Sequence, residues 1–266
     1  MTLSEIAPAK LNLALHVRGK LPDGRHAIET VFAFCTDGDW VEGELADDVT
    51  LEVIGPFAEA LSSDNIILTA ANALRAAAGA GQGAALRLFK NLPVASGIGG
   101  GSADAAAALR LLTRLWGIDP AHATAVAPGL GADVPACLLS MTARGTGAGD
   151  QLTLIDDPHV AGTPVLLVNP LVPLSTRAVF AQWDGVDRGE GRDWRDGRND
   201  LEKPARELVP EIGDVIDWLG SLPESKFVRM SGSGATCFAT FFSEGGRDDA
   251  AEDCPENWWR LATFLR

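Results

Sequence analysis

Residues 93–104 read Pro-Val-Ala-Ser-Gly-Ile-Gly-Gly-Gly-Ser-Ala-Asp, with four glycines in five positions ahead of an alanine-rich segment. Glycine has no Cβ atom and accepts positive φ, so a backbone rich in glycine can approach a ligand closely. The stretch therefore predicts a phosphate-binding loop. The alternative is a flexible surface turn that leads into an ordinary helix.

The residues after the glycines have the spacing of a helix. Alanine and leucine recur at helical intervals from Ser102 to Trp116, and Ser102 is suited to the N-cap. The start of a helix leaves N–H groups unpaired and carries partial positive charge, which attracts a phosphate group. We therefore expect the loop and the first helical turn to act together.

Neither of the two commonest phosphate-binding motifs fits this loop. A Walker A loop ends in Gly-Lys-Ser or Gly-Lys-Thr, and no such tripeptide occurs in the chain. A Rossmann fingerprint counted from Gly97 and Gly99 would need a glycine at Ser102, within a parallel βαβ unit. The loop indicates a different class of nucleotide-binding protein.

Composition limits the class of protein. The chain has 266 residues, 46% of them hydrophobic, which is enough for one large domain or two small ones. A net charge of −14 argues against a nucleic-acid surface, so a phosphate site would depend on local amides, a few lysines and a divalent cation. We expect no membrane segment and no signal peptide, because the chain has neither a long apolar run nor a basic and apolar N-terminus. A cytoplasmic location is the default expectation.

The four cysteines indicate a reduced protein. Cys35, Cys137, Cys237 and Cys254 are far apart in the sequence and form no CxxC pair. Cysteines of this kind are typical of core residues in a reducing compartment. No zinc site and no other metal-ligating residue is predicted.

Hydrophobic periodicity predicts mixed α and β structure. Residues 5–53 are rich in strand patterns, and the alternation around Leu11 and Leu13 puts Lys10 and Asn12 on one face. Helices are expected at 66–78, 102–116, 120–127, 134–139 and 211–219, the fourth capped by Asp133. Strands are expected at 28–34, 84–89, 151–155, 165–168, 237–242 and 258–265, and a solvated loop at 184–198.

Three motifs in a fixed order carry a family resemblance. Pro8-Ala9-Lys10-Leu11-Asn12, the glycine loop and Ser231-Gly232-Ser233-Gly234-Ala235 resemble the signature motifs of the GHMP small-molecule kinases, such as galactokinase, homoserine kinase and mevalonate kinase. Further motifs extend the resemblance over nearly the whole chain and narrow it to kinases of 4-diphosphocytidyl-2-C-methyl-D-erythritol: Asp23-Gly24-Arg25-His26, Leu130-Gly131-Ala132-Asp133-Val134-Pro135 and Asn199-Asp200-Leu201-Glu202. The resemblance implies an α+β fold of two domains, expected at 1–157 and 158–266, with the active site in the cleft between them.

The resemblance also implies the reaction. ATP, with Mg²⁺, would phosphorylate the 2-hydroxyl of this cytidine diphosphate sugar alcohol, on the non-mevalonate route to isoprenoid precursors. The expected partners are this substrate and ATP, with no nucleic acid and no membrane, and the chain is expected to be a monomer or weak homodimer. Two alternatives stay open: another GHMP kinase that acts on homoserine or a mevalonate derivative, and a nucleotide-binding regulator without catalysis. The presence of Lys10 and Asp133 favours an enzyme.

The resemblance assigns catalysis to Asp133 and Lys10. Asp133 would be the general base that takes the proton from the attacking substrate hydroxyl. The alternative is that Asp133 only caps a helix. Lys10 would lie beside Asp133, hold it as a carboxylate and stabilise charge on the transferring phosphoryl group. The alternative is a strand lysine that faces solvent.

The resemblance assigns binding roles as well. Asn12 and Thr176 would hydrogen-bond the substrate, His26 would bind the cytosine edge, and Phe180 would offer an aromatic face. Arg25 stands where the family usually has tyrosine, in a chain that contains no tyrosine, and its guanidinium plane can stack on a base. Asn65, which can alternatively cap a helix, and Lys90 would contact ATP near the adenosine. The other expected ATP contacts are Pro93, Ala95, Ser96, Gly97, Ile98, Gly99, Gly100, Gly101, Ser102 and Ala103.

Overall fold

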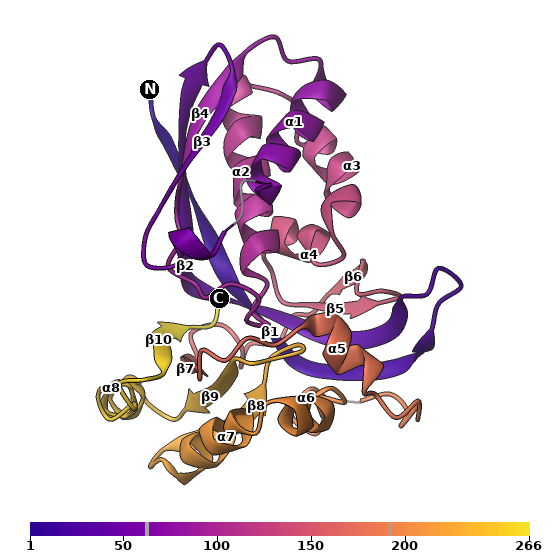
Figure 1. Cartoon of the computed structure of the whole chain (residues 1–266), viewed down its shortest axis with the longest axis vertical. Helices are drawn as coiled ribbons and strands as arrows, with labels where there is room; N and C mark the ends of the chain where they lie inside the picture. The colour runs from indigo at the N-terminus through magenta and orange to yellow at the C-terminus, as the bar shows by residue number, and fades with distance from the viewer. Residues whose placement is uncertain (62–63, 192) are drawn as a thin grey trace. The chain divides into compact units, whose positions relative to one another are not determined.

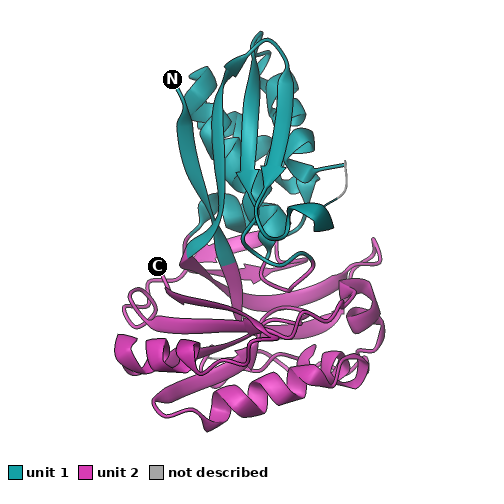
Figure 2. Ribbon diagram, turned by 60° about the vertical axis from the view of Figure 1, so that its left-hand side comes forward, with its two compact units in different colours: residues 1–9, 37–94, 99–140 teal, residues 10–36, 95–98, 141–266 magenta. Residues whose placement is uncertain are grey.

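The computed structural model describes residues 1–61, 64–191 and 193–266 and divides the chain into two compact units (Figures 1 and 2). Unit 1 comprises Met1–Ala9, Asp37–Val94 and Gly99–Ser140, and unit 2 comprises Lys10–Thr36, Ala95–Ile98 and Met141–Arg266. The units alternate along the chain because strands β1 (Leu3–Lys20) and β2 (His26–Ala46) each contribute to both. The compact units therefore differ from the two consecutive segments that the sequence led us to expect.

Unit 1 is a sheet with helices on one face. Strand β4 (Gly83–Phe89) pairs antiparallel with the second half of β2 and parallel with β3 (Val49–Ile54). A Cβ atom at Gly43 would lie 2.7 Å from a methyl carbon of Leu111, so glycine in the sheet allows helix α2 to approach closely. The helices that pack together here are α1 (Ile66–Ala78), α2 (Gly100–Trp116), α3 (Pro120–Leu130) and α4 (Val134–Leu139) (Figure 1).

The alanine-rich helix begins two residues earlier than we expected. Helix α2 starts at Gly100, and its N-cap is Gly99, which has a φ of 66° and makes no side-chain cap hydrogen bond. The carbonyl of Gly99 accepts the first helical bond, from Ala103 N at 2.8 Å. The prediction that Ser102 caps the helix is therefore wrong, because a left-handed glycine can begin the helix without a side-chain cap.

Unit 2 contains a four-stranded antiparallel sheet in the order β10-β7-β9-β8. These strands are β7 (Pro164–Asn169), β8 (Ser225–Met230), β9 (Cys237–Phe241) and β10 (Trp259–Phe264). Helix α7 (Glu211–Ser221) packs on β8 and β9, and helix α8 (Glu244–Glu252) packs on β7 and β10. The apolar core of unit 2 therefore lies between this sheet and its helices.

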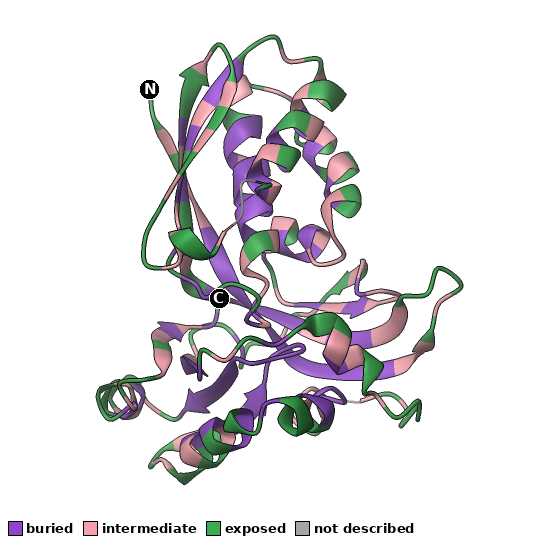
Figure 3. Cartoon of the chain, in the orientation of Figure 1, coloured by how far each residue is buried: buried purple, intermediate pink, exposed green. Residues whose placement is uncertain are grey.

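The second part of β1, from Lys10, and the first part of β2, up to Thr36, also belong to unit 2. There β2 pairs antiparallel with β5 (Ala143–Thr146), which pairs with β6 (Gln151–Leu154). Residues Ala7–Val17 of β1 are buried on both sides of the strand, as Figure 3 shows in purple. The strand therefore has no solvent-exposed face at Lys10 and Asn12.

Local patterns predicted most elements, including the short helix α4, but missed three helices of unit 2. The expected helices at 66–78 and 211–219 and the strands at 84–89 and 165–168 are present within one or two residues. The helices α5 (Thr176–Ala181), α6 (Glu202–Leu208) and α8 were not expected; α8 is strongly acidic and begins at a Ser243 cap. Within the described ranges, no helix combines the length and apolar character that crossing a membrane requires.

Candidate active site

Ser231 is fully buried and joins three segments of unit 2. Its hydroxyl donates to the carbonyl of Gly97 at 3.0 Å and accepts from the backbone N–H of Asn12 at 3.1 Å. Two further backbone bonds support the same arrangement, from Lys10 N to Ile98 O at 2.9 Å and from Thr236 N to Ser96 O at 3.1 Å. The middle of the glycine loop is therefore held between β1 and the loop that carries Ser231.

Glycine is required where these two loops touch. Gly97 has a φ of 77°, and a Cβ atom there would lie 2.6 Å from the carbonyl oxygens of both Ser231 and Gly234. Gly232 has a φ of 56°, and a Cβ atom there would lie 2.9 Å from the carbonyl oxygen of Gly97. Such contacts leave no space for a side chain on either loop. The alternative of a flexible surface turn does not describe this part of the glycine loop.

Lys10 and Asn12 lie together in a buried polar chain. The ammonium of Lys10, whose residue is only 3% exposed, donates to Asn12 Oδ1 at 2.7 Å. Asn12 Nδ2 in turn donates to the hydroxyl of Thr30 at 2.7 Å, and that hydroxyl donates to the carbonyl of Ala14. The Lys10 ammonium also lies 5.3 Å from the ring centroid of Phe32. Lys10 is therefore not the solvent-facing strand lysine of the alternative interpretation.

Asp133 occupies the N-cap position of helix α4 in unit 1 but does not cap it. Its φ and ψ are −86° and −13°, and its side chain makes no cap hydrogen bond. Pro135 in the first turn has no N–H to satisfy, which reduces the need for a side-chain cap. The expectation that Asp133 caps this helix is wrong, because its carboxylate does not bond the first turn.

Asn65 and Lys90, which we expected near adenosine, both have structural roles in unit 1. Asn65 caps helix α1, its Oδ1 accepting from Ile67 N at 2.9 Å. Lys90 is 1% exposed and its ammonium binds Asp39 Oδ2 at 2.5 Å and Asp104 Oδ2 at 2.7 Å. Both residues are buried, and both side chains bond groups within unit 1.

The Lys90, Asp39 and Asp104 side chains form a buried triad next to the glycine loop. Asp39 Oδ1 accepts from the N–H groups of Asn91 and Leu92, at 2.6 and 2.8 Å, and so fixes the residues that lead into the loop. A Cβ atom at Gly100 would lie 3.1 Å from the Lys90 ammonium nitrogen, so the triad lies close to the first turn of α2. Asp104 is the last residue of the glycine-loop motif, but no role was assigned to it, and Asp39 lies outside the motifs.

The pKa values of Asp104 and Lys90 in the triad are both shifted. Burial raises the pKa of Asp104 to about 8, although the nearby Lys90 favours its charged form. Burial works against the charge of Lys90, but the two carboxylates outweigh it and raise the pKa of the ammonium. Burial of the three groups together therefore favours protonation of Asp104 and the charged form of Lys90.

The residues expected at the cytosine pocket meet in unit 2. The rings of His26 and Phe180 are stacked, with centroids 4.7 Å apart and an interplanar angle of 25°. The Thr176 hydroxyl lies 2.9 Å from the hydroxyl of Ser233. Burial, with a contribution from the charge of Lys20, lowers the pKa of His26, so its imidazole is neutral at pH 7.

Arg25 does not adopt the stacking role that its position suggested. Its guanidinium is 53% exposed and pairs with Asp23, Nε to Oδ2 at 2.8 Å, and with Asp150, NH1 to Oδ2 at 3.8 Å. The side chain is thus directed to two carboxylates and not to the ring of His26 or Phe180. A different residue must supply any second aromatic surface in this pocket.

The motif at residues 199–202 holds the Ser231 loop in place. Asn199 Nδ2 donates to the carbonyl oxygens of Met230 and Gly232, at 2.8 and 2.7 Å. Asp200 Oδ2 accepts from Val17 N at 2.8 Å and so ties the same segment to β1. The motif was visible in the sequence, but its function as a backbone clamp was not.

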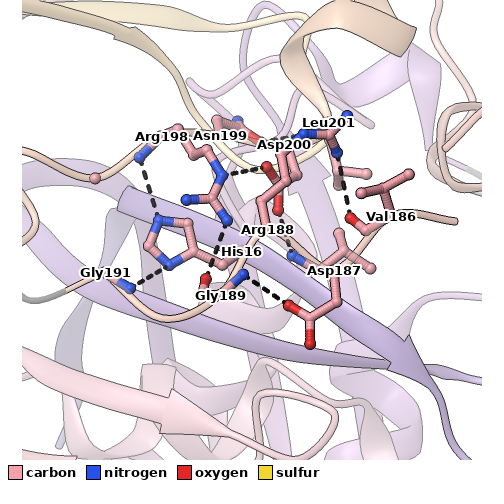
Figure 4. A network of polar contacts seen from close by, with 12 residues as sticks. His16, Val186, Asp187, Arg188, Gly189, Gly191, Arg198, Asn199, Asp200 and Leu201 are labelled. Carbon is pink, nitrogen blue, oxygen red and sulfur yellow. Dashed lines mark hydrogen bonds and ion pairs between the residues drawn. The ribbon is translucent and has the colours of Figure 1, made fainter. Parts of the chain in front are cut away.

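The charged segment 184–198 is anchored to β1 by His16 (Figure 4). Gly191 N lies 3.1 Å from Nδ1 of His16, and Arg198 N lies 3.2 Å from Nε2. A neutral imidazole has one acceptor nitrogen, so it accepts one of these N–H groups at a time. Burial, assisted by Arg198, lowers the pKa of His16 and keeps the ring neutral. The described residues of the segment form no helix or strand and 184–190 are mostly exposed, as we expected of a solvated loop, and His16 anchors this loop at Gly191 and Arg198.

Comparison with known proteins agrees with this arrangement. Residues 65–141 match the GHMP kinases N terminal domain, and residues 180–258 match the GHMP kinases C terminal domain. The chain belongs to the GHMP kinase family, whose members use ATP as phosphoryl donor. The resemblance inferred from the three motifs, and the α+β fold that it implied, are confirmed.

Relatives narrow the similarity within the family. The chain is 51% identical to a 4-diphosphocytidyl-2-C-methyl-D-erythritol kinase of Rhizorhabdus wittichii, over 99% of this chain and 94% of the relative. It is 49% identical to a kinase of the same name from Novosphingobium aromaticivorans, over 100% and 94%. A crystal structure of 4-(cytidine 5'-diphospho)-2C-methyl-D-erythritol kinase superposes with a TM-score of 0.85 at 30% identity, covering 99% of both chains. Homoserine kinase from Cytophaga hutchinsonii shares the fold alone, at a TM-score of 0.71 and 16% identity.

The contact between the two glycine loops predicts that Gly97→Ala destabilises the protein. The new methyl group would clash with two carbonyl oxygens, and alanine disfavours a φ of 77°. We expect the free energy of unfolding to fall by about 2 kcal/mol or more, measured by urea denaturation.

Gly101→Ala is the matched control in the same loop. A Cβ atom there meets only Ile66 Cγ2, at 3.9 Å, and the residue is helical, so the variant should be as stable as the wild type or slightly more stable. Equal effects of the two substitutions would contradict the close contact at Gly97.

The protonated state of Asp104 predicts a pH-dependent effect of Asp104→Asn. The pKa of this carboxyl is near 3.8 in the unfolded chain and about 8 in the folded protein, so the folded state binds the proton more tightly. The free energy of unfolding of the wild type therefore falls as pH rises through this window, and asparagine removes that loss. Between about pH 5 and pH 8 the stability of the variant relative to the wild type should rise by at least ~1 kcal/mol.

Urea denaturation at the two pH values measures this effect, with Asp39→Asn as the comparison. Asp39 accepts from Lys90 and from two backbone N–H groups, so its neutral variant should be less stable than the wild type at both pH values. A stability difference for Asp104→Asn that does not change with pH would exclude a protonated Asp104.

Proposed function

We propose that this chain is an ATP-dependent kinase that phosphorylates the 2-hydroxyl of 4-diphosphocytidyl-2-C-methyl-D-erythritol, a step of the non-mevalonate route to isoprenoid precursors. The observation that carries the proposal is the buried Ser231 junction, which brings Lys10, Asn12 and the glycine loop together. The substrate follows from the relatives, which are similar over nearly their full length and carry this name. The stacked His26 and Phe180 rings are consistent with a base-binding pocket.

The chemistry assigns a separate role to each catalytic residue. Asp133 accepts the proton of the substrate hydroxyl while the hydroxyl oxygen forms a bond to the γ-phosphorus of ATP. The bond from that phosphorus to the bridging oxygen breaks, and ADP leaves. Lys10 stabilises the negative charge that is spread over the transferring group, as a preorganised ammonium held by Asn12.

ATP binds to the glycine loop and the first turn of α2. The unpaired backbone N–H groups of a helix start attract phosphate, and the glycines remove the side chains that would keep it away. Mg²⁺ supplies charge neutralisation when it is bound to the triphosphate. Among the described residues, no group of three or more His, Cys, Asp or Glu could hold a metal ion.

Different residues bind the cytosine end and the sugar-alcohol end of the acceptor. The neutral His26 can both donate to and accept from the cytosine edge, and Phe180 offers a stacking surface. Asn12 and Thr176 provide hydrogen bonds to the polar part of the substrate. We also propose that the enzyme works in the cytoplasm, as its widely spaced cysteines indicate, and as a monomer or weak homodimer, since one chain carries all the assigned residues.

A coupled assay for ADP release tests the proposed function. The purified chain is incubated with ATP, Mg²⁺ and each of four acceptors: the cytidine diphosphate sugar alcohol, its uridine analogue, homoserine and mevalonate. Rapid ADP release with the cytidine compound alone supports the proposal. Turnover of homoserine or mevalonate instead would assign a different GHMP kinase activity, and ATP binding without turnover of any acceptor would indicate a regulator.

Asp133→Asn is expected to reduce kcat by at least ~100-fold, because asparagine cannot accept the proton of the substrate hydroxyl. The dissociation constant for ATP should change less than about twofold, because no ATP contact is assigned to Asp133. Stopped-flow turnover and calorimetric titration with ATP measure the two quantities.

Asp119→Asn provides the matched control for this variant. Asp119 is an N-cap aspartate whose Oδ1 does bond the first turn of helix α3, accepting from Ala121 N at 2.8 Å. Asparagine is an equally good N-cap, so this variant should retain full turnover. Wild-type turnover in Asp133→Asn would remove Asp133 as the general base.

The lowered pKa of His26 predicts how substrate affinity depends on pH. Because the ordinary value of 6.5 is shifted downward, the ring stays neutral through neutral pH and becomes charged only under more acidic conditions. The KM for the cytidine substrate should be constant at neutral pH and increase below pH 6, since the charged ring can no longer accept a hydrogen bond. His26→Gln, which keeps a donor and an acceptor without titrating, should lose this increase. A KM with the same pH profile in both proteins would show that His26 does not read the base in its neutral form.

A further inference from the structure

The structure leaves one side of the expected base pocket without the residue that the sequence pattern calls for. The chain has no tyrosine, and the guanidinium of Arg25 is paired with Asp23 and Asp150. Only Phe180 remains among the residues that we expected to offer an aromatic surface there. A pyrimidine held by a single ring would lose part of the stacking energy that nucleotide pockets normally supply.

Trp183 is a second aromatic residue in contact with His26. Its ring meets that of His26 edge to face, with centroids 5.7 Å apart and an interplanar angle of 89°. His26 is thus in contact with two aromatic rings, Phe180 on its face and Trp183 at right angles. Trp183 follows directly after helix α5, which carries Thr176 and Phe180, and its backbone N–H donates to the carbonyl of Phe180 at 3.3 Å.

The indole N–H of Trp183 is a hydrogen-bond donor that the protein itself does not use. Its Nε1 is buried, and the described residues provide it with no acceptor. An indole nitrogen can only donate, and a buried donor without an acceptor is unfavourable. By contrast, the indole N–H of Trp194 has an acceptor, because its Nε1 donates to Asp157 Oδ2 at 3.0 Å. The unused donor of Trp183 can be satisfied by an acceptor that a ligand brings, once the side chains that cover Nε1 move aside.

The segment after Trp183 is held in a way that fixes its position. Farther along the chain, the ring of His16 in β1 lies within hydrogen-bond distance of Gly191 N and Arg198 N (Figure 4). Asp200 in turn accepts from the backbone N–H of β1 at Val17. Arg198 adds bonds to Asp200 Oδ1 at 2.6 Å and to the carbonyl of Gly189 at 3.0 Å. Trp183 thus lies between an ordered helix and an anchored segment, as a preorganised binding residue does.

We propose that Trp183 is a substrate-binding residue that completes the pyrimidine pocket with His26 and Phe180, and that its Nε1–H donates to the 2-carbonyl oxygen of the base. This assignment rests on the proposed function, because it specifies a contact to the substrate of that reaction. It also divides the recognition of the base. Cytosine and uracil share the 2-carbonyl, so Trp183 contributes affinity for both, and discrimination between them falls to His26.

The test compares Trp183→Phe, which keeps an aromatic ring without the N–H, with the wild type. We expect the KM for the cytidine substrate and the dissociation constant for CDP to rise about tenfold, with kcat and the KM for ATP changing less than about twofold. The ratio of kcat/KM between the cytidine substrate and its uridine analogue should stay the same. Trp183→Leu, which removes the ring as well, should raise both constants further.

Trp258→Phe is the matched control, since Trp258 contacts Trp218, away from His26, and should leave all constants unchanged. Trp183→Phe with the wild-type KM for the cytidine substrate and the wild-type dissociation constant for CDP would overturn the proposal. An equal loss of affinity for ATP and CDP would also overturn it, because such a loss indicates a structural role only. The titration with CDP separates this inference from the proposed function. A wild type without turnover contradicts the kinase reaction, whereas the effect of Trp183→Phe on CDP binding still decides the role of Trp183; a wild type that does not bind CDP overturns that role.

Discussion

The Ser231 hydroxyl provides the contact on which the rest of the candidate site depends. One buried oxygen accepts from the backbone of Asn12 and donates to that of Gly97, so it fixes a strand and a loop that are 85 residues apart in sequence. A hydroxyl can do both because it carries one donor and two acceptor positions on a short side chain. Asn199 holds the Ser231 loop from its other side. The positions of the Lys10 strand and the glycine loop are therefore fixed by hydrogen bonds from short side chains to their backbone.

An acidic protein that binds a polyanion needs local sources of attraction. The net charge of −14 repels ATP at long range, and Lys90, the lysine next to the glycine loop, is held by Asp39 and Asp104. In the proposed site the attraction would come from the backbone N–H groups at the start of α2, from Lys10 and from a divalent cation. The protonated Asp104 adds no further negative charge beneath the loop. Affinity for ATP thus depends on how accurately the backbone is positioned, which explains why so many contacts fix the loop.

The sequence predicted the elements that local patterns define. Helical spacing identified α1, α2 and α7, and the motif order identified the family. It did not predict the start of α2, since a left-handed glycine cap has no side-chain pattern. It also did not predict the partners that only folding brings together: Ser231 with Gly97, Lys90 with two aspartates, and Trp183 with His26. These contacts join residues far apart in the chain, and none of them has a characteristic local spacing.

The absence of tyrosine at position 25 bears on how the proposed base pocket is built. A tyrosine combines an aromatic face with a polar group, and Arg25 here provides neither to the base, because two carboxylates hold its guanidinium. Trp183 has the same combination, a ring with an N–H at its edge, but it comes from the end of α5. A change at one strand turn can therefore be offset from a separate element, provided that the new ring reaches the same partner. The shared partner is His26, and its neutral ring is what the two aromatic contacts orient toward the substrate.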